Sequence, residues 1–253
     1  MKIVSLVENT SARNDVKSEH GLSLYIEACG NKILFDMGQG ELFLENAKVL
    51  GVDLSGVDIA IISHGHYDHG GGLEKFLEIN EIAPVYVNKK AFLPYYNGER
   101  YIGLDFPMSE SNRLIKVKGD LSLAEGLSLV TLDLPPDDTG NLKLRKDGRF
   151  FPDSFDHEQY LLIEEKGKRV LISGCSHKGI IAIAKNFMPD ALVGGFHFMD
   201  MPLGEGLKSR AEKLNSINCD FYTCHCTGEE QYKFLTKYMK RISYLAAGGE
   251  IEL

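Results

Sequence analysis

The sequence lacks several features that would assign it to a specialised class of protein. None of its apolar runs comes near the roughly 18 residues that a membrane-spanning helix needs, so we expect no membrane partner. The opening stretch from Met1 to Glu8 is too short, and too soon interrupted by charge, to be a signal peptide, and it predicts a strand instead. These absences favour a cytoplasmic protein.

Basic clusters and a disulfide framework are also missing. The net charge is −8, and no group of lysines and arginines is present to release counterions from nucleic acid, so we expect no nucleic-acid partner. A phosphorylated small molecule stays compatible with this charge, because bound metal ions would reverse the local field. The cysteines are odd in number and unevenly spaced, which excludes a disulfide scaffold; they are Cys29, Cys175, Cys219, Cys224 and Cys226.

What is present predicts a single domain over residues 1–253 in which strands and helices alternate. An apolar content of 43% with 25% charged residues is typical of a globular protein able to bury one large core. Residues 21–28 and 31–38 predict a hairpin, and 84–87 predict a further strand. Amphipathic helices are expected over 41–50, ending at Gly51, and from Gly72 onward.

Two stretches show little periodicity. Residues 91–112 predict a long loop or insertion, and residues 135–156 a second irregular segment. The aromatic side chains of the first stretch either stack on a planar substrate or pack the loop onto the domain, and we favour packing; they are Tyr95, Tyr96, Tyr101 and Phe106.

The stretch from His64 to Gly72 is the most informative part of the sequence. It follows the apolar strand-like run 58–63 and reads His-Gly-His-Tyr-Asp-His before three glycines. Neutral imidazole and carboxylate are ligands of zinc, iron and manganese, and a glycine-rich turn lets several side chains converge on one point. This segment therefore predicts a metal site.

Three later strand-like segments also end in histidine. These histidines are His177, after 168–173, His197, after 190–193, and His225, after 219–223. Because ligands of α/β proteins gather at the carboxyl ends of strands, we expect these side chains to share one site with the His64 segment.

With these motifs in place, the sequence resembles the metallo-β-lactamase superfamily over nearly its whole length. The resemblance implies an α/β four-layered αββα sandwich with a binuclear metal site at one sheet edge. Within the superfamily the sequence is similar to the dihydropterin-synthase-like subgroup, on the segments Val7-Glu8-Asn9, Glu19-His20-Gly21-Leu22-Ser23, Gly174-Cys175-Ser176-His177, Gly194-Gly195-Phe196-His197 and Thr223-Cys224-His225-Cys226-Thr227-Gly228.

The resemblance also implies a division of ligands between two metals. His64 and His66 match the pair that binds the first metal. Asp68 and His69 match ligands of the second, which His225 completes.

The sequence departs from the superfamily pattern after the strand at 168–173. Most members have a bridging aspartate where Cys175 stands here. His177 is therefore the candidate third ligand of the first metal, while Cys175 is either a soft ligand or a mere neighbour. Loss of a hard bridging carboxylate would weaken the second site or shift the choice of metal.

The other polar residues near these motifs are predicted to have different roles. His157 is predicted not to bind metal, and His20 either borders the cleft or lies on the surface. Asp36 is expected to orient the histidine segment by hydrogen bonding. Cys224 and Cys226 flank His225 along a strand, so we expect both to point away from the metals.

Three functions follow from such a site. The first is hydrolysis of an ester or phosphoester of a small molecule through a metal-activated water, with Asp68 or His197 moving a proton. The second, implied by the subgroup, is transfer of a reduced pterin from its pyrophosphate to an aminobenzene ribose phosphate. The third is metal binding without catalysis. We expect two divalent ions, zinc first, with iron, manganese or magnesium as alternatives; the oligomeric state stays open.

Overall fold

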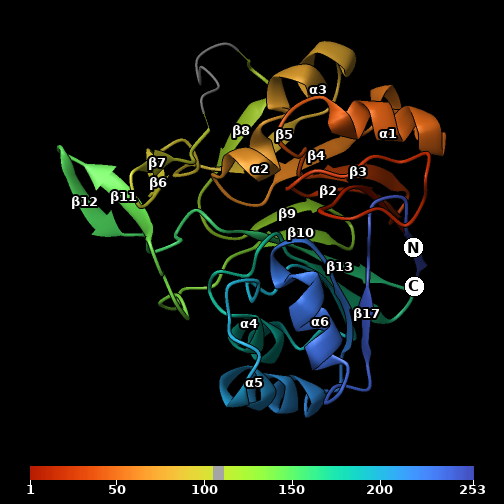
Figure 1. The fold of residues 1–253 in the computed structure, drawn as a ribbon. Coiled ribbons are helices and arrows are strands. Elements are labelled where there is room, and N and C mark those ends of the chain that lie inside the picture. The colour runs from red at the N-terminus through yellow and green to blue at the C-terminus, as the bar shows by residue number, and fades with distance from the viewer. Residues whose placement is uncertain (105–110) are drawn as a thin grey trace.

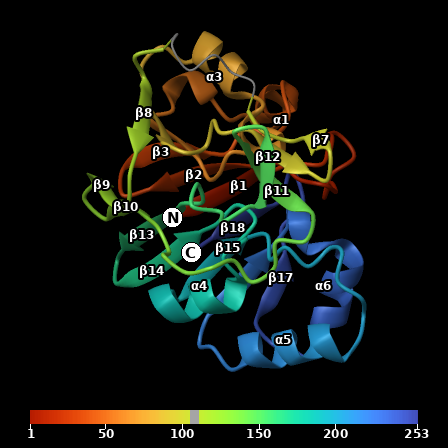
Figure 2. The ribbon, with the colours of Figure 1, turned by 90° about the vertical axis from the view of Figure 1, so that its left-hand side faces the viewer.

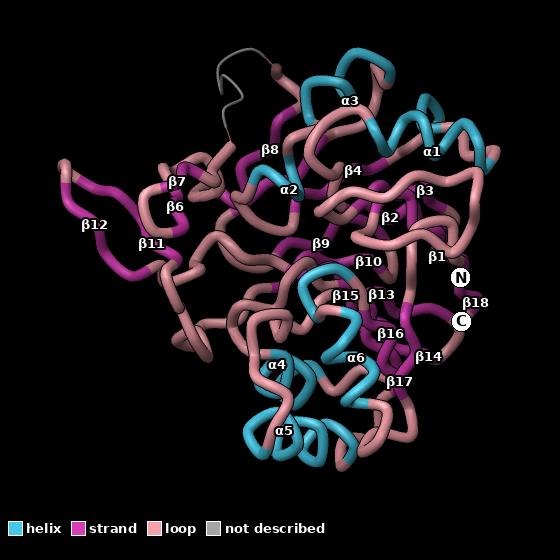
Figure 3. Tube along the Cα trace, viewed as in Figure 1, coloured by secondary structure: helices cyan, strands magenta, loops and turns pink. Residues whose placement is uncertain are grey.

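Two seven-stranded sheets lie face to face, and helices cover the outer face of each (Figure 1; Figure 3). This arrangement comes from a computed structural model that describes residues 1–104 and 111–253. The predicted four-layered αββα sandwich is confirmed.

The first sheet comes almost entirely from the first half of the chain. The predicted hairpin is present as β2 and β3, which pair antiparallel, whereas β3, β4, β5 and β8 are parallel. In spatial order the strands are β18 (Glu250–Glu252), β1 (Lys2–Val7), β2 (Ser23–Ala28), β3 (Asn31–Phe35), β4 (Ile59–Ile62), β5 (Val85–Asn88) and β8 (Leu114–Val117).

The second sheet comes almost entirely from the second half of the chain. Its strands β14, β15, β16 and β17 run parallel, so the turns that carry His177, His197 and His225 leave the same edge. In spatial order the strands are β17 (Ile242–Tyr244), β16 (Asp220–Thr223), β15 (Ala191–Gly194), β14 (Lys168–Ile172), β13 (Tyr160–Glu165), β10 (Leu127–Val130) and β9 (Leu121–Ala124).

Three apolar clusters hold the layers together. One lies between the sheets, a second packs α1 and α3 onto the first sheet, and a third packs α4, α5 and α6 onto the second. The helices are α1 (Leu42–Leu50), α2 (Tyr67–Gly70), α3 (Leu73–Ile79), α4 (Ile180–Phe187), α5 (Glu205–Asn215) and α6 (Glu229–Leu235). As predicted, α1 ends at Gly51, whose left-handed φ of 70° suits glycine.

The two termini are far apart in the sequence but lie beside each other in space (Figure 1; Figure 2). The first strand β1 pairs antiparallel with the last, β18. No helix of residues 1–104 and 111–253 is long and apolar enough to cross a membrane.

The two irregular stretches contain more structure than expected. Residues 91–112 include β6 (Tyr95–Asn97) and β7 (Arg100–Tyr101), and residues 135–156 include the hairpin of β11 (Leu142–Lys146) and β12 (Arg149–Pro152). The four strands pair as a third small sheet, which projects from the sandwich (Figure 1). Sequence periodicity missed it because β6 and β7 have only three and two residues, too few to show alternation.

The aromatic residues of this region have different environments. The Tyr95 ring is buried and stacks on His157 with centroids 4.0 Å apart, as the packing interpretation predicts. Tyr96 meets Tyr101 edge to face at 5.4 Å. Phe106 lies outside the described residues.

Candidate metal centre

The histidine loop begins directly after β4 and turns into the short helix α2. Gly65 is required at this turn, because a Cβ there would lie 2.0 Å from the carbonyl oxygen of Ala91. The amide of Tyr67 donates to the carbonyl of Ile102 at 2.9 Å and fixes the loop on its other side. Close backbone packing therefore sets the direction of the side chains that follow.

A first group of imidazoles joins the two halves of the chain. Ligand nitrogens of His64, His66 and His177 lie within 4.8 Å of one another, and all three side chains are buried. His177 comes from the turn after β14, in the other sheet. The residues predicted to hold the first metal are thus brought together.

A second group lies beside the first. The Nε2 atom of His69 is 3.2 Å from Cys175 Sγ and 3.2 Å from His225 Nε2. The Asp68 carboxylate is 3.4 Å from His225 Nε2 and 3.2 Å from His20 Nε2. The residues predicted for the second metal also converge. His20, for which the cleft and the surface were both open, is exposed and lies beside Asp68 and His225.

Asp36 orients this second group as expected. Its Oδ2 lies 2.7 Å from His69 Nδ1, and its two oxygens accept hydrogen bonds from the amide and hydroxyl of Ser63, each at 2.7 Å. Because Nδ1 is held by the carboxylate, the Nε2 atom of His69 faces the centre.

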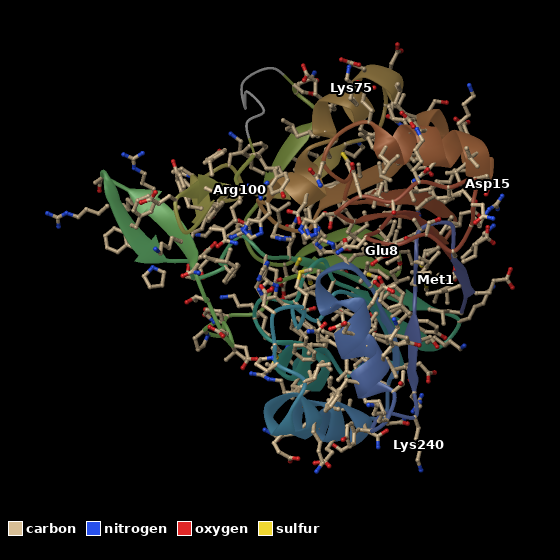
Figure 4. The ribbon with its side chains drawn as sticks, viewed as in Figure 1. Met1, Glu8, Asp15, Lys75, Arg100 and Lys240 are labelled. Carbon is tan, nitrogen blue, oxygen red and sulfur yellow. The ribbon has the colours of Figure 1, made fainter. Side chains whose placement is uncertain are left out.

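Glu8 and Asn9 perform the same task for His225. Glu8, buried between the two halves of the molecule (Figure 4), accepts a 2.6 Å hydrogen bond from the His225 amide. The Asn9 Oδ1 atom lies 2.8 Å from His225 Nδ1. Sequence reasoning gave neither residue a role, although the Val7-Glu8-Asn9 segment carried part of the resemblance.

Comparison with known proteins assigns the family. Residues 18–208 match the model of the metallo-β-lactamase superfamily. The chain belongs to the metallo-β-lactamase superfamily. An uncharacterised protein of Methanocaldococcus jannaschii is 33% identical, with 92% of this chain and 91% of that protein covered.

Two further relatives of this superfamily member carry descriptions. The 7,8-dihydropterin-6-methyl-4-(β-D-ribofuranosyl)-aminobenzene-5'-phosphate synthase of Methanocaldococcus jannaschii is 27% identical, covering 100% of this chain and 96% of the synthase. A crystal structure described as a metal-dependent hydrolase of the β-lactamase superfamily superimposes with a TM-score of 0.81 at 29% identity, covering 100% of this chain and 99% of that one. One relative is thus described as a synthase and the other as a hydrolase.

The donor set of this metallo-β-lactamase fold suits metal ions. Within the described part of the chain, His66 Nε2, both ring nitrogens of His177 and His197 Nδ1 are buried without a hydrogen-bond partner. An unpaired buried polar atom costs about 1–3 kcal/mol, which a bound metal would offset. Burial, with the neighbouring His157, lowers the pKa of His66 to about 3, so this imidazole is neutral and its lone pair is available.

His157 lies next to the first group but has other partners. Its Nδ1 accepts a 2.8 Å hydrogen bond from the Gly65 amide, and its Nε2 lies 3.1 Å from Asp153 Oδ2. Both nitrogens are therefore engaged by the protein, as expected of a residue that supports the loop and does not bind metal.

The flanking cysteines of His225 do not behave alike, and the expectation for one of them is wrong. Cys224 packs in the apolar cluster between the sheets, as predicted. Cys226 instead lies with its sulfur within 4.8 Å of ligand atoms of Cys175 and His225. The strand ends at Thr223, and His225–Thr227 form a 3-10 turn, so the alternation of a strand no longer applies.

Several residues around the centre adopt left-handed backbone conformations. His197, His225 and Asp36 have φ values of 57°, 49° and 61°. Such conformations cost non-glycine residues of order 1 kcal/mol each and are held by surrounding structure. Their concentration here is typical of a functional site.

A cavity of about 300 Å³ opens beside the first group. His177 and His197 form part of its wall, together with the apolar side chains of Phe198 and Met201 and the guanidinium of Arg210. Its volume lies at the lower end of the range for small-molecule sites.

Proposed function

We propose that this protein is a metal-dependent hydrolase that cleaves an ester or phosphoester bond of a small molecule at two divalent metal ions. The observation that carries the proposal is the cluster of buried imidazoles with unpartnered nitrogens, His66 and His177 above all, next to a cavity. Similarity to a structure described as a metal-dependent hydrolase supports it.

His64, His66 and His177 would hold the first ion. Asp68, His69 and His225 would hold the second, with Cys175 as a soft ligand in place of the usual carboxylate. Imidazole with thiolate suits zinc first; iron, manganese and magnesium are the alternatives, and magnesium suits sulfur least.

When bound, two such ions lower the pKa of a water molecule and stabilise negative charge on the substrate. The chain itself supplies orientation and proton transfer. Asp36 and Asn9 fix His69 and His225 through hydrogen bonds of 2.7 and 2.8 Å. We assign Asp68 and His197 to proton movement, because Asp68 lies within the second group and His197 lines the cavity.

The substrate we propose is a small molecule and not nucleic acid. The cavity of about 300 Å³ admits a ligand of modest size, and its apolar wall suits a ring or acyl group. The guanidinium of Arg210 in that wall is paired with Asp137, so an anionic substituent such as a phosphate would have to bind the metal ions.

Transfer of a pterin is a second candidate function. Its support is the synthase of Methanocaldococcus jannaschii, which this chain matches over its full length. The same residues would then bind an anionic leaving group while the second substrate displaces it.

Purification without a metal-chelating tag, followed by elemental analysis and turnover assays, tests the proposal. We expect about two metal ions per chain and metal-dependent hydrolysis of 4-nitrophenyl esters or bis(4-nitrophenyl) phosphate. Absence of turnover with zinc, iron, manganese and magnesium would count against hydrolysis. Calorimetry with a reduced pterin tests the second candidate function, which predicts that the pterin binds to the protein. Absence of binding would count against pterin transfer.

A further inference from the structure

We propose that Cys226 is a second sulfur ligand of the metal centre, which would then carry two thiolates, Cys226 and Cys175. This inference rests on the proposed function, because it concerns a residue of the same site. It goes beyond that function by assigning a ligand from outside the expected set and by predicting a preference for soft metal ions.

The sulfur of Cys226 lies close to two other possible ligand atoms. It lies within 4.8 Å of Cys175 Sγ and of a His225 ring nitrogen, and the three residues are buried. Cys226 is 3% exposed. A single ion contacts thiolate sulfur at about 2.3 Å and imidazole nitrogen at about 2.0 Å, so donor atoms this close together can share one ion.

The backbone holds the sulfur in this position. The carbonyl of Cys226 accepts hydrogen bonds from the amides of Phe198 and Met199, each at 3.0 Å. Thr227, the next residue, accepts a 2.8 Å hydrogen bond from the Phe196 amide. The turn that follows β16 is thus tied to the turn that follows β15, and the backbone that carries the Cys226 side chain is fixed.

Space is kept open for the thiol. A Cβ at Gly195 would lie 2.3 Å from Cys226 Sγ, so only glycine permits this placement. The amide of His197 points at the sulfur with a separation of 3.3 Å. Amide donors directed at sulfur stabilise a thiolate, the form that binds metal.

Apolar packing does not account for the position. Cys224 and Cys219 belong to the apolar clusters of the two sheet faces, where buried cysteines act as small hydrophobic residues. Within the described residues, neither Cys226 nor Cys175 belongs to one of the three clusters. Both lie among imidazoles.

Two thiolates predict which metals bind well. Soft sulfur ligands favour zinc, cobalt and cadmium over magnesium and manganese. We therefore expect cadmium to displace zinc from the protein and a large excess of magnesium to leave the zinc content unchanged.

Cobalt substitution tests the ligand directly. A thiolate bound to Co²⁺ gives a near-ultraviolet charge-transfer band. We expect Cys226→Ser and Cys175→Ser each to lose roughly half of that band, while Cys219→Ser, the same substitution outside the centre, keeps all of it. A Cys226→Ser protein with the full band of the wild type would overturn the inference.

X-ray absorption of the zinc-loaded wild type gives an answer that does not depend on variants folding. Two sulfur ligands shared by two zinc ions predict an average of about one sulfur per zinc at about 2.3 Å. A sulfur count at half that value or below refutes a centre with two thiolates and leaves metal binding itself intact. A wild type that binds neither zinc nor cobalt refutes the proposed function as well.

Discussion

The two halves of the chain build one centre in opposite ways. The first half supplies His64, His66, Asp68 and His69 from one loop, within six residues. The second half supplies one or two side chains from each of three separate turns, after β14, β15 and β16. A contiguous loop can be recognised in the sequence, whereas separate turns acquire their meaning only when parallel strands bring them to one edge.

The halves also differ in how their histidines are held. His69 relies on the carboxylate of Asp36, at the end of β3 in its own half. His225 relies on Glu8 and Asn9, which come from the opposite end of the chain. His225 is therefore oriented by residues that no local pattern connects with it.

Removal of one imidazole from each half should have the largest effect on metal content and activity. We expect His66→Ala and His177→Ala each to lose about one metal ion per chain and to lower kcat/KM by about 10³-fold, because each removes a ligand of the same ion. Elemental analysis and steady-state kinetics measure both effects. Retained stoichiometry in His177→Ala alone would show that the second half contributes no ligand to the first ion.

Replacement of His197 should separate catalysis from metal binding in the second half. In His197→Gln we expect kcat to fall about 10²-fold while both ions stay bound, because the residue is assigned to proton movement. The measurement is kcat with metal content determined on the same sample. Loss of an ion would instead identify His197 as a ligand, in line with its short distance to Cys175 and His177.

A change at Asp36 tests the positioning of the first-half loop. Asp36→Asn should weaken metal affinity about 10- to 100-fold, because it removes the negative charge and one acceptor from His69. Competition with a chromogenic chelator measures the affinity. Asp58→Asn is the matched control, since Asp58 accepts a hydrogen bond from the Lys32 amide in the same sheet, away from the centre; an equal loss there would indicate a general effect on the sheet.

The corresponding change at Asn9 should have the smallest effect. Asn9→Ala removes a neutral hydrogen bond from His225, and such bonds contribute about 1 kcal/mol, so we expect affinity to fall about 5-fold. The same chelator assay applies. A loss as large as that of Asp36→Asn would mean that the two halves depend equally on their positioning residues.

Much of the fold could be predicted from periodicity and turn residues. The hairpin of β2 and β3 and the helix α1 ending at Gly51 follow local rules that few long-range contacts override. The small third sheet could not be predicted, because β6 and β7 have three and two residues. The pairing of β6 with β11 depends on contacts across about 50 residues of sequence.

The candidate metal centre could also be predicted only in part. Candidate metal ligands after β4, and histidines after the ends of β14, β15 and β16, can be recognised from the sequence alone. The three-dimensional fold was needed to show that Glu8 and Asn9 hold His225, that His20 lies beside Asp68, and that Cys226 lies beside Cys175. The reason is that side-chain direction in a turn depends on backbone angles such as the φ of 49° at His225, and the turn is fixed by hydrogen bonds to distant segments.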